Sequence, residues 1–176
     1  TPEQEARLLD VNLRGVLHGC RAFLPALRAR GGGHIVNISS MAGYVGIPYQ
    51  SLYCATKFAV HGLSQALRAE LAADGIGVTS VHPGTIRTGV LANAATHDAG
   101  ISGRLGALML RFGMAPETVA RRVVRAVRRN TGEIRMTLEC HATWLALRLS
   151  PWLVGWSMTL LARLGQRVLV LEHHYV

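Results

Sequence analysis

The amino-acid sequence predicts an α/β fold built on a parallel sheet, and three observations support this. Residues 1–30 carry apolar side chains at helical spacing, and a short, largely apolar strand follows at 34–39. The same order of helix and strand repeats over 51–73 and 76–81. Neither strand alternates strictly between polar and apolar residues, which is typical of parallel strands buried on both faces. Helices and strands that alternate in this way form an α/β sheet.

Length and composition favour one compact domain, or part of one, over a disordered chain. The 176 residues are 49% hydrophobic and only 16% charged. The cysteines, Cys20, Cys54 and Cys140, are scattered, which argues against a disulfide scaffold and against a structural metal site. Because the first residues are polar and acidic, the sequence predicts no signal peptide and a cytoplasmic protein.

The basic side chains are almost all arginine. The formal net charge is +9, from 19 basic and 10 acidic residues, and Lys57 is the only lysine. A lysine kept where arginine fills every other basic position indicates chemistry that a guanidinium cannot perform. The arginines within 116–129 lie at helical spacing opposite valines, which predicts a solvated helix face. Without aromatic side chains among them, they predict no nucleic-acid partner.

The first helix is predicted from the residues at its two ends. Thr1 and Gln4 fit a capping box, and Pro2 occupies the first helical position, where its missing N–H costs nothing. Pro25 and the glycines at 31–33 place the end of this helix near residues 26–30. The strand 34–39 follows directly.

A loop, a second helix and a second strand come next. Glycine and proline residues predict a loop over 40–50. Helical spacing then covers 51–73, and Asp74 and Gly75 supply the signal that ends the helix. The strand 76–81 follows at once, so the two predicted strands are joined by a loop and a helix, as in a parallel βαβ unit.

The second half of the chain is predicted to add a lid, another helix and strand, and a tail. Glycines interrupt residues 85–115, which predicts a substrate lid with little regular structure. A helix over 116–129 begins with proline, and 134–138 is the last predicted strand. These elements complete a domain over 1–140, and residues 141–176 form an apolar helical tail.

Tyr53 and Lys57 stand four residues apart on the predicted helix 51–73, so they share one face of it. An ammonium group beside a phenol stabilises the phenolate and lowers the pKa of the tyrosine. A tyrosine in that state can exchange a proton with an alcohol or ketone oxygen. The spacing alone is common on helices, but with the residues described next it predicts acid–base catalysis at a carbonyl group.

Further polar or conformationally special residues follow the predicted strands. Ser40 comes after the strand 34–39, and Pro83 and Gly84 come after the strand 76–81. Ligands of open α/β sheets bind at the carboxyl ends of the strands, where a serine hydroxyl can hydrogen-bond a substrate oxygen. Asn12 is a polar residue and a poor helix former within the first helix.

Taken together, these stretches resemble the short-chain dehydrogenase/reductase family. The matching segments are 11–15, 33–43, 53–60 and 82–88, in the family's order and spacing. The resemblance implies a Rossmann-type doubly wound sheet, of which this chain supplies the second half. It also implies reversible hydride transfer between NAD or NADP and a carbonyl or secondary alcohol, and a homo-oligomer when the protein is intact.

The same resemblance implies a role for each site residue. Tyr53 would be the general acid/base, Lys57 would lower the pKa of Tyr53 and hold the nicotinamide ribose, and Ser40 would orient the substrate carbonyl. Asn12 would support a proton-relay water near Lys57. The residues expected to flank the nicotinamide are Pro83, Gly84, Ile86 and Thr88.

One motif of the family is not found in this sequence. Members hold the cofactor pyrophosphate with a Thr-Gly-x-x-x-Gly-x-Gly turn that follows their first strand. The glycines at 31–33 precede a strand instead, so they predict a turn and not a phosphate cradle. The sequence therefore predicts a C-terminal fragment that lacks roughly 100 residues of the family's fold. The alternative is a catalytically inactive remnant that acts, if at all, through its tail.

Other classes of function have weaker support. The stretch 62–66 imitates a nucleophile elbow of a hydrolase, but it falls inside a predicted helix and not at a strand-to-helix turn. His173 and His174 are adjacent, and Cys140-His141 has no evident third ligand, so no metal site is predicted.

Two expectations concern the substrate and the tail. Apolar side chains dominate the lid, which predicts either a lipophilic substrate or internal packing. They are Val90, Leu91, Ile101, Leu105, Leu108, Met109, Leu110, Phe112 and Met114. Residues 144–171 carry tryptophans and leucines flanked by arginines, but their longest uncharged run, 149–162, is too short to span a bilayer. They predict packing on the sheet or on a second subunit, with peripheral membrane contact as the alternative.

Overall fold

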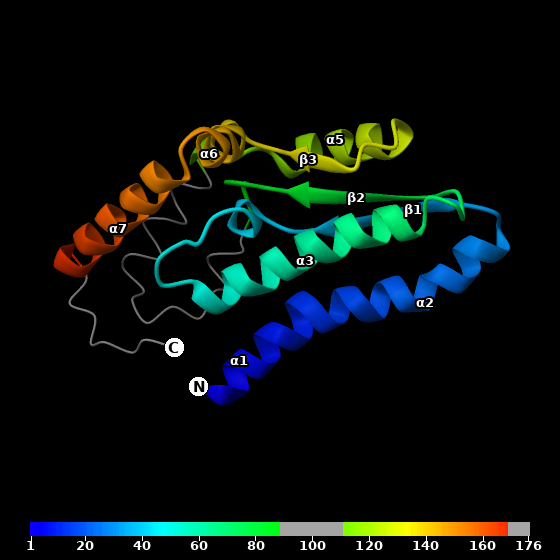
Figure 1. Cartoon of the computed structure of the whole chain (residues 1–176), viewed down its shortest axis with the longest axis horizontal. Helices are drawn as coiled ribbons and strands as arrows, with labels where there is room; N and C mark the ends of the chain where they lie inside the picture. Colours follow the sequence, from blue (N-terminus) through cyan, green and yellow to red (C-terminus); the bar gives the residue numbers. More distant parts are fainter. Residues whose placement is uncertain (89–110, 169–176) are drawn as a thin grey trace.

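The computed structural model describes residues 1–88 and 111–168, and within them it contains a parallel sheet in the order β1-β2-β3. The strands are β1 (Gly33–Ile38), β2 (Ile76–His82) and β3 (Glu133–Arg135). Ile35 of β1 lies beside Val78 of β2, and Val81 of β2 lies beside Ile134 of β3. The predicted α/β fold with a parallel sheet is confirmed (Figure 1).

Helices cover both faces of this sheet. Helices α2 (Gly15–Ala29) and α3 (Ser51–Glu70) lie on one side, and α5 (Pro116–Arg128) lies on the other (Figure 1). Every residue of β2 is buried, as expected for the central strand of such a layered structure. A hydrophobic core forms where β2 meets α2 and α3, from the buried Leu71, Ile76 and Val78 and the partly buried Leu24, Leu27, Ile35 and Leu67.

The N-terminal helical region is not the uniform helix that the sequence predicts. Helix α1 (Pro2–Leu9) begins with the predicted capping box, in which the Thr1 side chain accepts from the Gln4 N–H. A π-helical turn, η1 (Asp10–Arg14), follows α1 and makes the helix wider there before α2 begins. Pro25 lies inside α2 and does not end it. The helix ends where Gly31 adopts a φ of 77°, a conformation that favours glycine.

The remaining elements lie close to their predicted positions, with shifted ends. Helix α3 ends at Glu70, before the predicted 73, because a turn leading to Gly75 (φ 67°) already starts at Leu71. Strand β3 is shorter than predicted because helix α6 (Leu138–Leu149) begins directly after it. Helix α6 therefore crosses the predicted boundary between the domain, 1–140, and the tail, which starts at 141.

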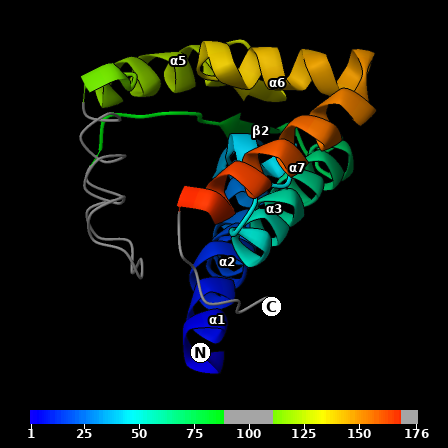
Figure 2. The same ribbon diagram turned by 90° about the vertical axis from the view of Figure 1, so that its left-hand side faces the viewer.

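Helix α7 (Pro151–Val168) crosses the carboxyl end of the sheet (Figures 1 and 2). The Tyr49 hydroxyl, in the loop before α3, donates to the carbonyl oxygen of Ala162 on α7 at 2.9 Å. Trp152 and Trp156 of α7 are 71% and 62% exposed. Among the described helices, none combines the length and apolar character needed to cross a membrane.

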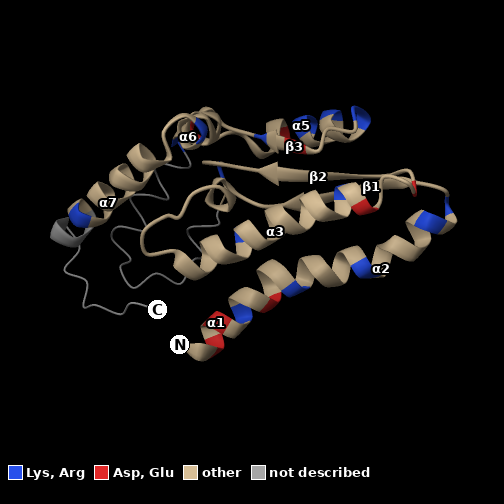
Figure 3. Cartoon of the chain, in the orientation of Figure 1, with Lys and Arg blue, Asp and Glu red and all other residues tan. Residues whose placement is uncertain are grey.

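The predicted solvated face of α5 is confirmed by the exposure of its arginines, whose positions along the helix are blue in Figure 3. Ala126 is buried on the opposite side. The exposed arginines are Arg121, Arg122, Arg125 and Arg128.

Most of the predicted lid over 85–115 lies outside the described residues, which omit 89–110. The two ends of the segment are paired with each other. Ile86 forms a parallel bridge with Met114, and the Arg87 N–H donates to the Met114 carbonyl at 2.9 Å. The two described ends of the segment therefore lie side by side, beside the carboxyl end of β2.

Candidate active site

Tyr53 and Lys57 share one face of α3, as their spacing predicts. The Nζ atom of Lys57 lies 5.6 Å from the centre of the Tyr53 ring. The same nitrogen donates to the carbonyl oxygen of Ile38 at 3.2 Å, so it is held at the carboxyl end of β1. Partial burial lowers the pKa of Lys57, because removal from water disfavours the charged form. The phenol therefore lies beside a partly desolvated ammonium group.

Ser40 follows Ser39 after β1 and is the N-cap of the short 3-10 helix η2 (Met41–Gly43). Its backbone is extended, and its Oγ accepts from the Ala42 N–H at 3.1 Å, which caps η2. This bond uses a lone pair of the oxygen and not its proton. The hydroxyl is half-buried, and its proton can be donated to an oxygen of a ligand.

The loops after β1 and β2 are joined by backbone hydrogen bonds. The Ser39 N–H donates to Val81 and the Met41 N–H donates to Pro83, both at 2.8 Å. The Ser39 hydroxyl also donates to the Lys57 carbonyl at 2.8 Å, which ties the loop to α3. The structure therefore brings together the Ser40 loop, the Pro83 loop and the turn of α3 that carries Lys57. All three lie at the carboxyl end of the strands.

Asn12 lies in the π-helical turn η1 and contacts α3. Its Nδ2 donates to the Thr56 hydroxyl at 3.4 Å, and that hydroxyl donates to the Tyr53 carbonyl at 2.7 Å. Thr56 is fully buried. Asn12 is thus linked through Thr56 to the backbone of Tyr53. Its predicted support of a proton-relay water near Lys57 stays a prediction. The role of Thr56 was missed, although a threonine between Tyr53 and Lys57 was a visible signal.

The residues after β2 pack against the start of α6. A Cβ atom at Gly84 would collide with the side chains of Thr137 and Glu139, so a larger residue there would force these side chains to move. The Glu139 carboxylate accepts from the Thr85 N–H at 2.7 Å. Ile86 pairs with Met114, and the Thr88 N–H donates to the Ile86 carbonyl at 2.9 Å. The loop that carries the predicted nicotinamide contacts, as far as Thr88, is therefore held by contacts with α6 and with Met114.

A cluster of polar rings, which the sequence analysis missed, lies behind Ser40. Its members are Tyr44, His61 and His82, and Glu133 of β3 joins them through a 3.1 Å contact with His61. Burial holds the pKa of His82 at about 4. The hydrogen bond with His61 lowers the pKa of Glu133 to about 2. The one sequence signal was the histidine directly before Pro83.

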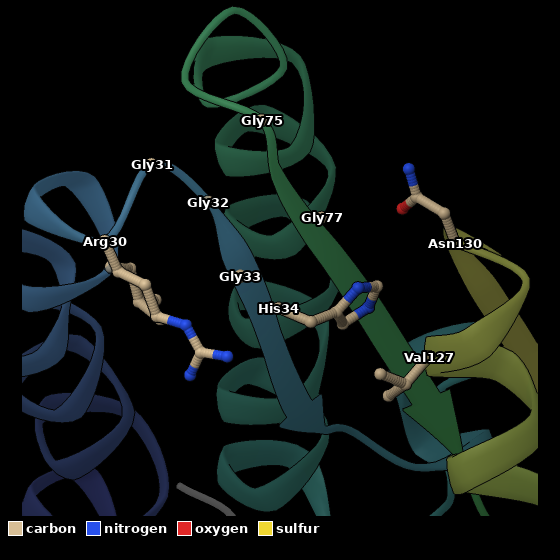
Figure 4. Close-up of a pocket in the computed structure, with 10 residues that line it drawn as sticks. Arg30, Gly31, Gly32, Gly33, His34, Gly75, Gly77, Val127 and Asn130 are labelled. Atoms are coloured by element: carbon tan, nitrogen blue, oxygen red, sulfur yellow. The ribbon is translucent and has the colours of Figure 1, made fainter.

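A hollow of about 700 Å³ lies at the other end of the sheet (Figure 4). It is lined by the glycines at 31–33, Gly75 and Gly77, together with Arg30, His34 and Asn130. These residues surround the amino ends of β1 and β2, away from Ser40 and Lys57. Because ligands of open α/β sheets sit at the carboxyl ends of strands, this hollow is not the candidate active site.

Comparison with known proteins shows the family of the chain. Residues 1–99 match the family model described as short chain dehydrogenase. The chain belongs to the short-chain dehydrogenase family. A Mycobacterium tuberculosis protein named "Probable oxidoreductase EphD" is 41% identical over 158 residues, which cover 85% of this chain and 27% of that protein. SadH of the same organism, also named an oxidoreductase, is 40% identical over 81% of this chain and 53% of its own length.

Solved short-chain dehydrogenases share the fold. One from Burkholderia cenocepacia, in complex with NADP, has a TM-score of 0.74 and 26% identity, covering 90% of this chain and 60% of that one. One from Burkholderia phymatum, in complex with NAD, has a TM-score of 0.66 and 28% identity, covering 76% of this chain and 53% of that one. The chain thus spans between 27% and 60% of the length of these short-chain dehydrogenases and oxidoreductases.

Proposed function

We propose that this chain carries the acid–base part of an NAD(P)-dependent oxidoreductase, which transfers a hydride between the nicotinamide and a carbonyl or secondary alcohol. The observation that carries the proposal is the Tyr53–Lys57 pair, set on α3 beside the loop of Ser40. Family membership supports it, as do the NADP and NAD complexes of the two Burkholderia relatives.

Each of these residues has its own role in the reduction of a carbonyl group. Ser40 donates its hydroxyl proton in a hydrogen bond to the substrate oxygen, and Tyr53 transfers its phenolic proton to the same oxygen. The ammonium of Lys57 stabilises the phenolate that remains. Asn12 acts through the buried Thr56 hydroxyl, which holds the backbone of Tyr53. The bound cofactor supplies the hydride.

The residues present fit one end of the dinucleotide. Lys57 uses one of its three N–H donors on Ile38, which leaves donors for the ribose hydroxyls. We propose that Pro83, Gly84, Ile86 and Thr88 flank the nicotinamide. The pyrophosphate end does not fit, because the glycine turn at 31–33 lies at the amino end of β1 (Figure 4), whereas Lys57 contacts Ile38 at the carboxyl end of the same strand. The sequence holds no Thr-Gly-x-x-x-Gly-x-Gly motif elsewhere.

The substrate class is proposed to be lipophilic, because apolar residues dominate segment 85–115. The complete gene product should oxidise NADH or NADPH with long-chain or steroid-like ketones faster than with small hydrophilic ones. The readout is the loss of nicotinamide absorbance across a matched panel of ketones. A preference for polyols or sugars would contradict the substrate class without affecting the reaction type.

A catalytically inactive remnant is the competing proposal, favoured by the missing pyrophosphate motif. Calorimetric titration separates the two. Residues 1–176 alone should bind NAD(P) weakly or not at all, because no glycine-rich turn before a helix N-terminus holds the diphosphate. The complete gene product should bind it and turn over. Failure of the complete gene product to bind either dinucleotide would establish the remnant.

Contacts of the tail and the oligomeric state are also proposals. The exposed side chains of Trp152 and Trp156 support contact of 144–171 with a second subunit, with the membrane surface as the alternative. A cytoplasmic protein that forms a homo-oligomer is expected to stay in the detergent-free fraction. Sedimentation of the complete gene product with and without 144–176 tests this.

A further inference from the structure

The short turn from Ser40 to Gly43 is held at both ends by imidazole rings. His82 of β2 reaches the carbonyl oxygen of Ser40, and His61 of α3 reaches the carbonyl oxygen of Gly43. The two rings meet edge to face, with their centres 4.5 Å apart. Neither ring has a role in the proton transfer described above. Both rings contact the turn that carries Ser40.

His82 has a defined protonation state because of its two partners. Its Nδ1 lies 2.9 Å from the Ser40 carbonyl oxygen, which can only accept, so Nδ1 carries the proton. Its Nε2 lies 2.9 Å from the Ser80 hydroxyl, which donates to it. The ring is fully buried and stacks on Tyr44, with the ring centres 4.2 Å apart. Burial also lowers the pKa of His82 to about 4, so the neutral ring persists at neutral pH.

The hydrogen bond from His82 is a side-chain contact to the Ser40 carbonyl, which also accepts from the Gly43 N–H at 3.0 Å within the turn. The Ser39 N–H and the Met41 N–H are tied to the loop after β2. The Ser40 carbonyl lies between them, and His82 holds it. Ser40 carries both this carbonyl and the side chain. Fixing the carbonyl therefore fixes the direction in which the Cα–Cβ bond, and with it the hydroxyl, leaves the backbone.

His61 holds the other end of the turn. Its Nδ1 lies 3.2 Å from the Gly43 carbonyl, and its Nε2 lies 3.1 Å from the Glu133 carboxylate. The hydrogen bond to Glu133 raises the pKa of His61, and the amide nitrogen of Gln65 also lies 3.0 Å from its Nε2. Gly43 itself packs on α3, where a Cβ atom would collide with the Lys57 carbonyl. The turn is thus fixed against the helix that carries Tyr53 and Lys57.

We propose that His82 is a positioning residue, whose Nδ1–H fixes the Ser40 peptide and so aims the Ser40 hydroxyl at the substrate oxygen. His61 and Glu133 support the far end of the same turn. The proposal rests on the proposed function, in which Ser40 contacts the substrate. His82 itself is fully buried and acts only through Ser40.

The same side chains could be read as a metal site, because ligand atoms of His61, His82 and Glu133 lie within 4.8 Å of one another. The contacts favour hydrogen bonding instead. Among the described residues, each ring nitrogen already has a protein partner. The other carboxylate oxygen of Glu133 pairs with Arg135, whose charge would repel a cation.

The test compares three variants of the complete gene product. His82→Leu removes the donor, whereas His82→Asn keeps an N–H donor at the position of Nδ1. Ser80→Ala is the matched control, since it removes the partner of Nε2 and leaves the contact with Ser40. His82→Leu should lower kcat by about tenfold or more with an unchanged cofactor Kd, because misplaced catalytic groups are costly. His82→Asn should restore most of kcat, and Ser80→Ala should leave it unchanged.

Two further readouts separate positioning from general stability. In a Ser40→Ala background, His82→Leu should cause no further loss of kcat, because the group that it aims is gone. Amide hydrogen exchange at Met41 and Ala42 should accelerate in His82→Leu but not in His82→Asn. Equal damage from both substitutions at His82, additive losses with Ser40→Ala, or activation by added Zn²⁺ would each overturn the proposal. Unchanged exchange at Met41 and Ala42 would also overturn it, even in a protein without measurable turnover.

Discussion

The ammonium nitrogen of Lys57 lies 5.6 Å from the centre of the Tyr53 ring, close to the carboxyl end of β1. This contact follows from their spacing of four residues on one helix. The helix alone does not place the pair beside a substrate. That placement comes from the Ser39 hydroxyl, which ties the Lys57 carbonyl to the loop that carries Ser40.

Replacement of Tyr53 by phenylalanine should reduce turnover of the complete gene product by about 100-fold or more, because it removes the proton donor and keeps the ring. The fold should be unaffected, since Tyr53 is not in the buried core. Initial rates with NADPH or NADH and a reducible ketone measure the effect, and circular dichroism controls for folding. Near-normal turnover would exclude Tyr53 as the general acid.

Lys57→Arg should also be damaging, although it preserves the charge. The ammonium of Lys57 fits a half-buried position against the Ile38 carbonyl, whereas the planar guanidinium is larger and needs a different arrangement of acceptors. We expect a rise in the cofactor KM together with a fall in kcat. Surface Arg125→Lys on α5 is the matched control and should change neither constant.

The helices, the strands and the catalytic spacing could be predicted because they depend on local patterns. The capping box at Thr1 and the strand at Ile76–His82 are of this kind. The π-helical turn around Asn12 could not be predicted, because it is not encoded by a local signal such as a proline or glycine.

Long-range side-chain partners were equally invisible in the sequence. Glu133 is separated from His61 by 72 positions, and nothing in either local sequence indicates their 3.1 Å contact. The ring cluster behind Ser40 was therefore missed, although His82 stands directly before a recognised motif. The hydrogen bond from Asn12 to Thr56 was invisible for the same reason, because it depends on how η1 packs against α3.

Thr56→Val should destabilise the protein by about 1–2 kcal/mol, because it leaves the shape almost unchanged but removes a fully buried hydroxyl that serves Asn12 and Tyr53. Thr56→Ser keeps the hydroxyl and should recover the hydrogen bonds at the expense of one methyl group. Denaturant unfolding measures both. If the proposed role of Asn12 is right, Thr56→Val and Asn12→Ala should be non-additive in kcat.

The His61–Glu133 pair should make stability depend on pH in two windows. The hydrogen bond from His61 lowers the pKa of Glu133 from 4.5 to about 2. The stabilisation of the fold by the Glu133 carboxylate is therefore present above pH 4.5 and is lost as the pH falls toward 2. The same bond raises the pKa of His61 above 6.5, so that contribution is present below pH 6.5 and is lost as the pH rises through the raised value. Tyr44, His82 and Arg135 also face the pair.

Glu133→Gln tests this dependence, because it keeps the shape of the side chain and removes the charge. The free energy of unfolding, measured across both windows, should vary less with pH in the variant than in the original protein. His18→Gln, a substitution at an exposed histidine on α2, is the control and should leave the profile unchanged. An equally steep profile in Glu133→Gln would assign the pH dependence to other groups.

The two sides of α7 should differ in their contribution to stability. Val154 is only 7% exposed, whereas Trp152 and Trp156, about half a helical turn away from it on either side, are 71% and 62% exposed. In the isolated chain, Val154→Ala should therefore cost about 1–2 kcal/mol, and Trp156→Ser should change the free energy of unfolding by less than about 0.5 kcal/mol. Denaturant unfolding at low protein concentration gives both values. A larger cost for Trp156→Ser, growing with protein concentration, would show instead that the tryptophan side of α7 is buried against a second subunit.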